Sequence, residues 1–171
     1  MLSGASQVLH VYEVTQGHGL VVSGQETYRA IVEAYGRVIT ASQDSDLVQQ
    51  VLESLQALNE RCRLFREPLF TDHYLASFMH AVLNLLVTVE GKAHHELLVV
   101  LLFELASVNR GHFYDLLFTS ACHTLTPELR DKLCQCTDLP TFTQHLNQFV
   151  LTARSSARST IVRPANDSTV F

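Results

Sequence analysis

Two long and almost wholly apolar segments, within residues 71–122, constrain the fold of this chain more than any other feature. Only the short sequence Val89–Lys92 separates them, and no group suited to catalysis lies between them. Each segment is too apolar for an ordinary helix with one face in solvent, and each is interrupted too early to cross a membrane. Because such helices hide their surface only against neighbours on several sides, the pattern predicts stacked helices.

Composition and charge exclude several classes of protein. A length of 171 residues is typical of one domain, and an apolar fraction of 47% supports a hydrophobic core. The formal net charge of −5 disfavours nucleic acid as a partner, because neutralising phosphates requires a basic surface. The first Arg or Lys is Arg29, so the N-terminus lacks the basic region of a signal peptide. We therefore expect an intracellular protein with no nucleic-acid partner and no membrane insertion.

Periodic apolar residues predict a series of helices joined by short turns. Residues 1–16 form a weak first helix that Gly17–Gly19 interrupts, and Ser23 with Glu26 fits a capping box at the start of the second. The spacing predicts that this second helix buries Tyr28, Ile31, Val32, Tyr35 and Ile39.

The third predicted helix has the clearest amphipathic pattern. Asp44–Asp46 supply its start, since acidic residues are favoured at the positive end of the helix dipole, and Pro68 stops it. Its apolar stripe recurs in steps of three and four, at Leu47, Val51, Leu55, Leu58, Cys62 and Phe65.

The two apolar segments are expected to form the next two helices. Thr71–Asp72 opens the first, which Gly91 ends, and its residues Met79 and Leu83 widen the apolar face so that neighbours touch it on two sides. The second segment runs from about His94 to Val108.

Three helices are predicted to follow. One covers His112–His123 with Phe113, Leu116, Leu117 and Phe118, and Thr126 then caps a short helix with proline at its first position. Asp138 caps the last helix, whose stripe consists of Leu139, Phe142, Leu146, Phe149 and Val150.

The pattern predicts three regions. Residues 1–22 are a partial helix and linker, 23–153 a helical-repeat domain, and 154–171 a disordered polar tail. No segment shows strand alternation, and helix pairs recur with a period of roughly 40 residues, which is typical of HEAT and armadillo arrays. We therefore expect an all-α, HEAT-like α-solenoid of stacked antiparallel helix pairs, with a compact helical bundle as the alternative.

Cysteine and histidine residues offer the best candidates for a metal site. Cys134 and Cys136, with Cys122–His123 upstream, lack the usual zinc spacing, and on a helix the two thiols of the pair diverge by about 200°. We therefore expect these cysteines to be buried, reduced thiols rather than zinc ligands. His94–His95 project about 100° apart on a helix. His73 and His80 share one helix face, but no carboxylate stands at a useful spacing.

Few other sequence motifs suggest a catalytic or binding site. The sequence contains no nucleophile elbow, phosphate-binding loop or dinucleotide-binding glycine pattern, so we expect no catalytic residues, no cofactor and no enzymatic activity. The final residues Ser168–Phe171 have the layout of a C-terminal peptide that a strand-adding domain binds.

The predicted helices also resemble a known family, across Glu26–Leu151. The matching phrases, in chain order, are Ala30–Gly36, Leu52–Asn59, Phe78–Val87, Ala106–Val108 and Asp138–Gln144. In these phrases the chain resembles the C-terminal end of the exportin-6 family of nuclear transport receptors, within the importin-β superfamily.

The resemblance implies the C-terminal end of a longer superhelix of HEAT repeats. It further implies a receptor that shuttles between nucleus and cytoplasm, has nuclear pore proteins as partners and exports profilin–actin with RanGTP. No individual residue is assigned to cargo or Ran by it. Two other hypotheses stay open at this point: a helical-repeat interaction scaffold unrelated to transport, and a small helical metal-binding protein using Cys122, Cys134, Cys136 and nearby histidines.

Overall fold

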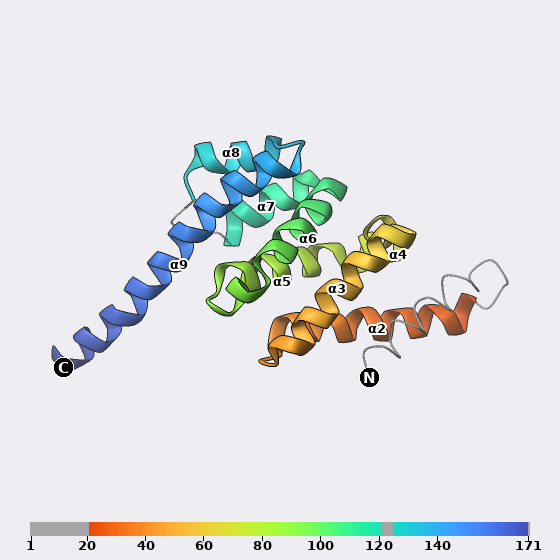
Figure 1. Ribbon diagram of the computed structural model, residues 1–171, viewed down its shortest axis with the longest axis horizontal. Coiled ribbons are helices and arrows are strands. Elements are labelled where there is room, and N and C mark those ends of the chain that lie inside the picture. Colours follow the sequence, from red (N-terminus) through yellow and green to blue (C-terminus); the bar gives the residue numbers. More distant parts are fainter. Residues whose placement is uncertain (1–20, 121–124, 171) are drawn as a thin grey trace. The chain divides into compact units, whose positions relative to one another are not determined.

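A computed structural model of the chain describes residues 21–120 and 125–170, with the side chains of 24–119 and 125–155. Helices make up almost all of this described part, which contains no strand (Figure 1). The chain divides into two compact units, residues 1–82 and 83–171, and the division falls inside a helix. The expected first helix, within residues 1–16, and the Gly17–Gly19 break lie outside the described residues.

The described residues of the first unit form helices, a 3₁₀ turn and short connections. Its elements are α2 (Val21–Ala41), α3 (Ser45–Cys62), the 3₁₀ turn η2 (Leu64–Arg66), α4 (Pro68–His73) and the first part of α5 (Leu75–Val87). Helices α2 and α3 pack against each other.

Helix α2 buries the face that the periodicity predicts. Confirmed as buried are Tyr28, Ile31, Val32, Tyr35 and Ile39. The predicted capping box is wrong, because the backbone is already helical at Val21 and Ser23 lies inside the helix. The backbone N–H groups that a Ser23 cap would satisfy can therefore bond to carbonyls of the preceding helical turn.

The start of α3 is confirmed. Asp44 is the N-cap, and its carboxylate accepts hydrogen bonds from the backbone N–H groups of Asp46 (3.1 Å) and Leu47 (3.2 Å). The side chain thus satisfies two of the donors that a helix start leaves without partners.

The end of α3 differs from the prediction. The helix ends at Cys62, because Arg63 adopts the left-handed conformation (φ 53°) and its N–H bonds to the Asn59 carbonyl at 2.9 Å. The Asn59 side chain then accepts from the N–H of Phe65 at 3.1 Å. Pro68 does not stop α3; it opens α4, where its missing N–H costs nothing.

The predicted helix start at Thr71–Asp72 is also wrong. Helix α4 already begins at Pro68, and Tyr74 interrupts the helical path before α5 begins at Leu75. Proline suits the first position of α4, and the fully buried Phe70 packs on both sides of the break, with its ring centroid 5.2 Å from those of Phe65 and Phe78.

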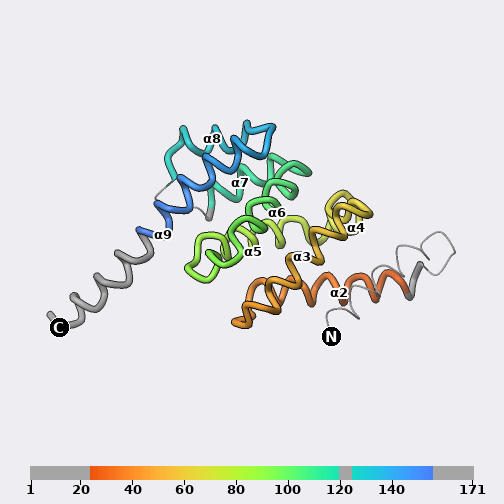
Figure 2. Tube along the Cα trace, viewed as in Figure 1, coloured from red at the N-terminus to blue at the C-terminus, as the bar shows by residue number. Residues whose placement is uncertain are grey.

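The described residues of the second unit form the rest of α5 and four further helices. Its elements are η3 (Glu90–His94), α6 (His95–Val108), α7 (Arg110–Ser120), α8 (Pro127–Gln135) and α9 (Leu139–Val170). Helix α6 packs against η3, α7 and α9, and α8 packs against α7 and α9 (Figure 2). Thr126 caps α8 as predicted, accepting from the N–H of Leu129 at 3.3 Å.

The buried residues of α6 form one wide face of the helix, and its other side is half-buried or exposed. They are Leu98, Val99, Leu101, Leu102, Leu105 and Ala106.

No single helix among the described residues is long and apolar enough to cross a membrane. The pair of segments 90–108 and 110–119 passes the test of length and composition together, but the two are bent by 118° at the break between them.

Helix α9 is the last element of the second unit. Asp138 caps it as predicted, accepting from the Thr141 N–H at 2.9 Å. Hydrogen bonds from the side chain and then the backbone N–H of Thr141 hold the pKa of the Asp138 carboxyl below its usual value. Near its middle, the Arg154 guanidinium donates to the Leu86 carbonyl at the end of α5 (2.7 Å). The backbone continues as helix to Val170, through the segment 154–171 for which composition predicts disorder. The boundaries of the three predicted regions stay a prediction.

Gly91 has a different role from the predicted one. Helix α5 ends at Val87, and Gly91 is buried in the following 3₁₀ turn. A Cβ atom on Gly91 would overlap the Leu85 carbonyl group, lying 2.8 Å from its carbon, and would stand 3.2 Å from Cα of Leu86. Glycine is therefore needed for the close approach of this turn to the end of α5.

We predict that Gly91→Ala lowers the free energy of unfolding by about 1–3 kcal/mol, since the methyl group forces this turn away from α5. Urea unfolding followed by circular dichroism measures the change. Gly111→Ala is the matched control: its Cβ would meet only the Asn109 side chain at 3.4 Å, in an exposed part of α7. This control should retain or gain stability, whereas equal stability of Gly91→Ala and the parent contradicts the packing argument.

Candidate functional site

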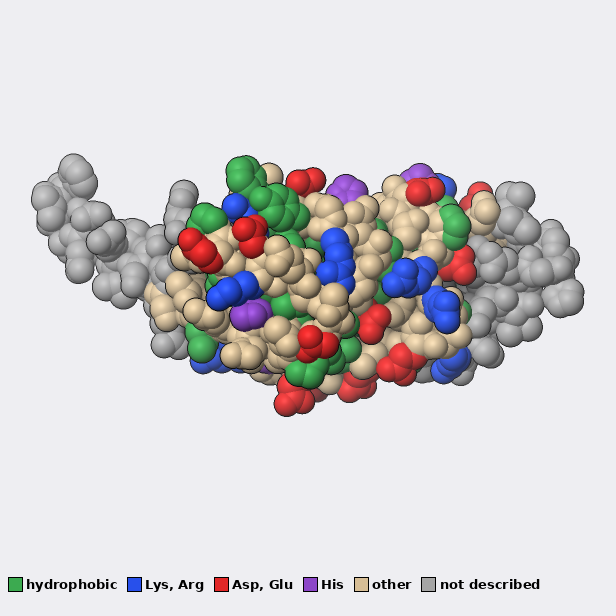
Figure 3. Space-filling view, turned by 90° about the horizontal axis from the view of Figure 1, so that it is seen from above, with side chains coloured by type: hydrophobic (Ala, Val, Ile, Leu, Met, Phe, Trp, Pro, Cys, Tyr) green, Lys and Arg blue, Asp and Glu red, His purple; other side chains and the backbone are tan. Residues whose placement is uncertain are grey.

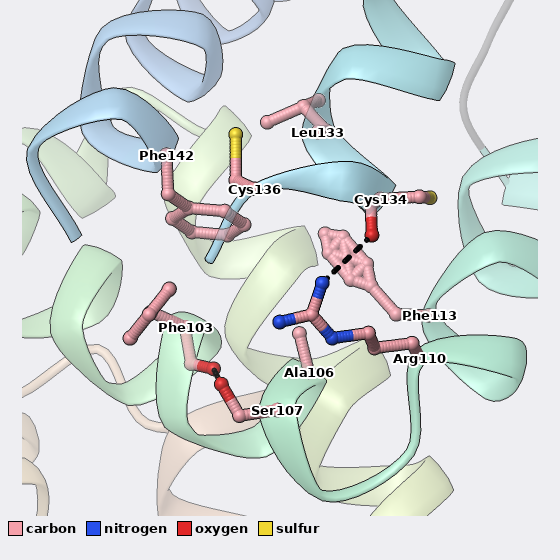
Figure 4. Close-up of a pocket in the computed structure, with 9 residues that line it drawn as sticks. All are labelled: Phe103, Ala106, Ser107, Arg110, Phe113, Leu133, Cys134, Cys136 and Phe142. Atoms are coloured by element: carbon pink, nitrogen blue, oxygen red, sulfur yellow. Dashed lines mark hydrogen bonds between the residues drawn. The ribbon is translucent and has the colours of Figure 1, made fainter. Parts of the chain in front are cut away.

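The cysteine pair that the sequence singled out lies at the end of α8. Cys134 is half-buried in the last turn, and Cys136 is the buried C-cap with extended backbone (φ −63°, ψ 131°). Their sulfur atoms point in different directions (Figure 4). Within the described residues no three His, Cys, Asp or Glu side chains gather to hold a metal ion, and Cys122–His123 lie outside those residues.

A small cavity adjoins the pair. Its volume is about 10 Å³, the space of a single water molecule. Arg110 crosses one side and donates to the Cys134 carbonyl at 3.2 Å (Figure 4). The cavity is lined by Phe103, Ala106, Ser107, Arg110, Phe113, Leu133, Cys134, Cys136 and Phe142. Such a space has no room for a substrate or an organic cofactor.

The environment of both thiols favours their protonated form. Burial raises the pKa of Cys134 to about 11, with Asp131 acting in the same direction and Arg130 and Arg110 opposing it. Burial likewise raises the pKa of Cys136, whose thiol donates to the Lys132 carbonyl. Because the thiolate is the nucleophile and metal ligand, these thiols are structural at neutral pH.

The histidine candidates are dispersed. His94 is buried in the 3₁₀ turn, while His95 opens α6 and its Nε2 lies 2.6 Å from the side-chain oxygen of Asn147 on α9. The prediction that His73 and His80 share one helix face is wrong, because the break at Tyr74 places them on α4 and α5. Both are exposed.

Sequence reasoning missed the surface formed by α7 and α8. Tyr114 and Phe118 stand one turn apart on α7, with exposed fractions of 38% and 64%. The guanidinium carbon of Arg130 on α8 lies 5.2 Å from the Tyr114 ring centroid and 5.0 Å from that of Phe118. We call these three residues the aromatic–arginine surface. The i, i+4 spacing of the two rings was its only signal in the sequence.

Arg130 has no polar partner in this surface. Its Nε atom is buried without a hydrogen bond, and no ion pair joins the guanidinium to another residue of the described part of the chain. On the face seen in Figure 3, acidic and basic side chains are interspersed. The surface therefore combines exposed aromatic rings with a fixed cation, a composition suited to binding protein.

Comparison with known proteins gives the family. Residues 5–156 match the family described as "Exportin-6, C-terminal TPR repeats". The chain belongs to this family. It is also 26% identical, over 137 residues, to a protein named Exportin-6 from Danio rerio. That alignment covers 76% of the chain and 12% of the relative's length, so the chain spans a small part of that protein. No solved structure matches.

Family membership confirms the predicted helical-repeat fold and refines its period. Repeats of the TPR kind are helix–turn–helix units of about 34 residues, whereas the sequence suggested roughly 40. In the structure, the starts of alternate helices, such as His95 of α6 and Pro127 of α8, stand roughly 30 residues apart, closer to the TPR period.

We predict that Cys134 reacts with iodoacetamide about tenfold more slowly than glutathione at pH 8. A pKa raised by two units cuts the thiolate fraction a hundredfold, and the greater nucleophilicity of a more basic thiolate recovers part of that loss. Peptide mass spectrometry of quenched samples measures the rate at each cysteine. Reaction of Cys134 as fast as glutathione contradicts the assigned environment.

Proposed function

We propose that this chain acts as the C-terminal helical scaffold of a nuclear export receptor of the exportin-6 type. In this role it carries protein cargo, profilin–actin, out of the nucleus together with RanGTP. The observation that carries the proposal is the family match, which extends over residues 5–156 and so includes nearly every described helix.

The nature of the described residues suits a scaffold. The apolar side chains of α6 and the aromatic residues of neighbouring helices are used to join helices, and the largest of them, including Phe113, Phe142 and Phe149, are fully buried. These buried side chains serve the function by holding the helices in a stack, because stacked helix pairs create extended surfaces on which a protein partner can bind. A receptor that binds protein and guanine-nucleotide-loaded Ran needs no catalytic group of its own in this segment.

The proposal also includes location and further partners. A receptor of this kind moves between nucleus and cytoplasm and contacts nuclear pore proteins in passing. Because the chain corresponds to 12% of the relative's length, we assign it the role of supporting the complex rather than providing the complete Ran and cargo surfaces.

The test is a chimera. In Danio rerio exportin-6, the segment that aligns with this chain is replaced by the 171-residue chain, and complex formation with purified profilin–actin is measured with and without RanGTP. We expect the chimera to form a RanGTP-dependent complex with affinity within about threefold of the parent receptor, a difference of at most about 0.7 kcal/mol.

Two controls define the contrary outcome. A receptor from which the aligned segment is deleted should lose most of the binding. A chimera that behaves like this deletion shows that the chain does not support the complex, and a deletion that binds as well as the parent shows that the segment has no part in it. If the chain binds other proteins but supports binding of neither RanGTP nor profilin–actin, it is a scaffold unrelated to transport.

A further inference from the structure

We propose that the aromatic–arginine surface of α7 and α8 binds an acidic, partly apolar segment of a partner protein. In this complex a carboxylate of the partner pairs with Arg130, and an adjacent apolar side chain covers the ring of Phe118. This inference does not depend on the chain's having a role in transport.

The apolar part of the argument rests on exposure. Phe118 leaves 64% of its surface in solvent, whereas its neighbour Leu117 is 1% exposed. The other large apolar residues exposed in the described chain, Val89 before η3 and Leu151 on α9, are single aliphatic side chains, which is ordinary for a protein surface. Phe118 instead adjoins a second exposed ring and a cation, and aromatic residues with arginine dominate the binding energy of protein interfaces.

The polar part rests on the state of Arg130. Two rings hold its guanidinium at 5.0 and 5.2 Å, so the side chain loses little further freedom when a ligand binds. Its Nε is buried and without a hydrogen bond, which leaves the terminal N–H groups as the donors for a ligand. The planar geometry of these donors matches the two oxygens of a carboxylate.

Local charge favours a single carboxylate over a highly charged ligand. Exposed acidic residues directly follow two members of the surface, Asp115 after Tyr114 and Asp131 after Arg130. These carboxylates repel a phosphate or a polyanion more strongly than one carboxylate, because the repulsion grows with ligand charge. One charge next to an apolar group is thus the chemistry that complements Arg130 and Phe118 together.

The experiment selects ligands without presupposing one. A random library of twelve-residue displayed peptides is sorted on the purified 171-residue chain, and enriched peptides are sequenced. We expect enriched peptides to place an Asp or Glu within a few positions of a large apolar residue. Enrichment of basic or purely apolar peptides, or none at all, overturns the proposal.

Matched variants then locate the binding. Arg130→Gln and Phe118→Ser should each weaken an enriched peptide about tenfold, the effect of losing one interface anchor. Leu151→Ser changes an apolar residue of nearly equal exposure, 65%, and Arg66→Gln changes an exposed arginine of the first unit; both should bind as the parent does. Equal weakening by all four variants, or by none, contradicts the assignment.

A fluorescent reporter supplies an independent reading. The chain contains no tryptophan, so Phe118→Trp introduces a single indole at the centre of the surface. Binding of the acidic peptide should shift its emission to shorter wavelengths, and replacing the peptide's acidic residue by its amide should weaken binding about tenfold. No emission shift at saturating peptide places the binding elsewhere. Dimerisation of the chain that buries this indole instead identifies a second copy as the occupant and overturns the proposal.

Discussion

The burial of one wide face of α6 is the constraint on which the second unit depends. Six of its fourteen residues are buried, and at 100° per residue they span an arc of about 160°, which is wider than a single stripe. Removing a leucine side chain from water stabilises a fold by about 1.5–3 kcal/mol, so α6 is stable only when α7, α9 and the turn before it cover it. The contacts of Arg154 with the end of α5 and of His95 with Asn147 hold α9 in the place where it covers this helix.

Local chemistry explains which parts of the fold could be predicted from the sequence. The caps at Asp44, Thr126 and Asp138 were predictable because each depends on one side chain and the next three residues. Pro68 and Gly91 were misinterpreted for the opposite reason. Both residues are compatible with a helix end, and only their neighbours decide otherwise: the buried Phe70 that follows Pro68, and the end of α5 against which Gly91 packs.

The candidate surface was harder to predict than the core. Periodicity places Phe118 with Phe113 and Leu117 in one apolar helix, but it does not say which side of α7 lacks a covering neighbour. Arg130 comes from the next helix, and its stacking on both rings depends on how α7 and α8 pack. By contrast, the cysteine pair attracts notice in the sequence, yet its burial and its protonated thiols make it part of the packing. A scaffold of this kind carries its function on the helix faces that packing leaves free.

Native-state hydrogen exchange of the whole chain tests the central claim most directly, because it measures the opening free energy of each helix separately. If α6 is the helix that the others cover, the amides of Leu98–Ala106 exchange only through global unfolding, with the largest protection and the full dependence on denaturant. Helix α8, at the surface and nine residues long, should open at lower free energy. Exchange of the α6 amides as fast as those of α8, with little dependence on denaturant, would contradict this account.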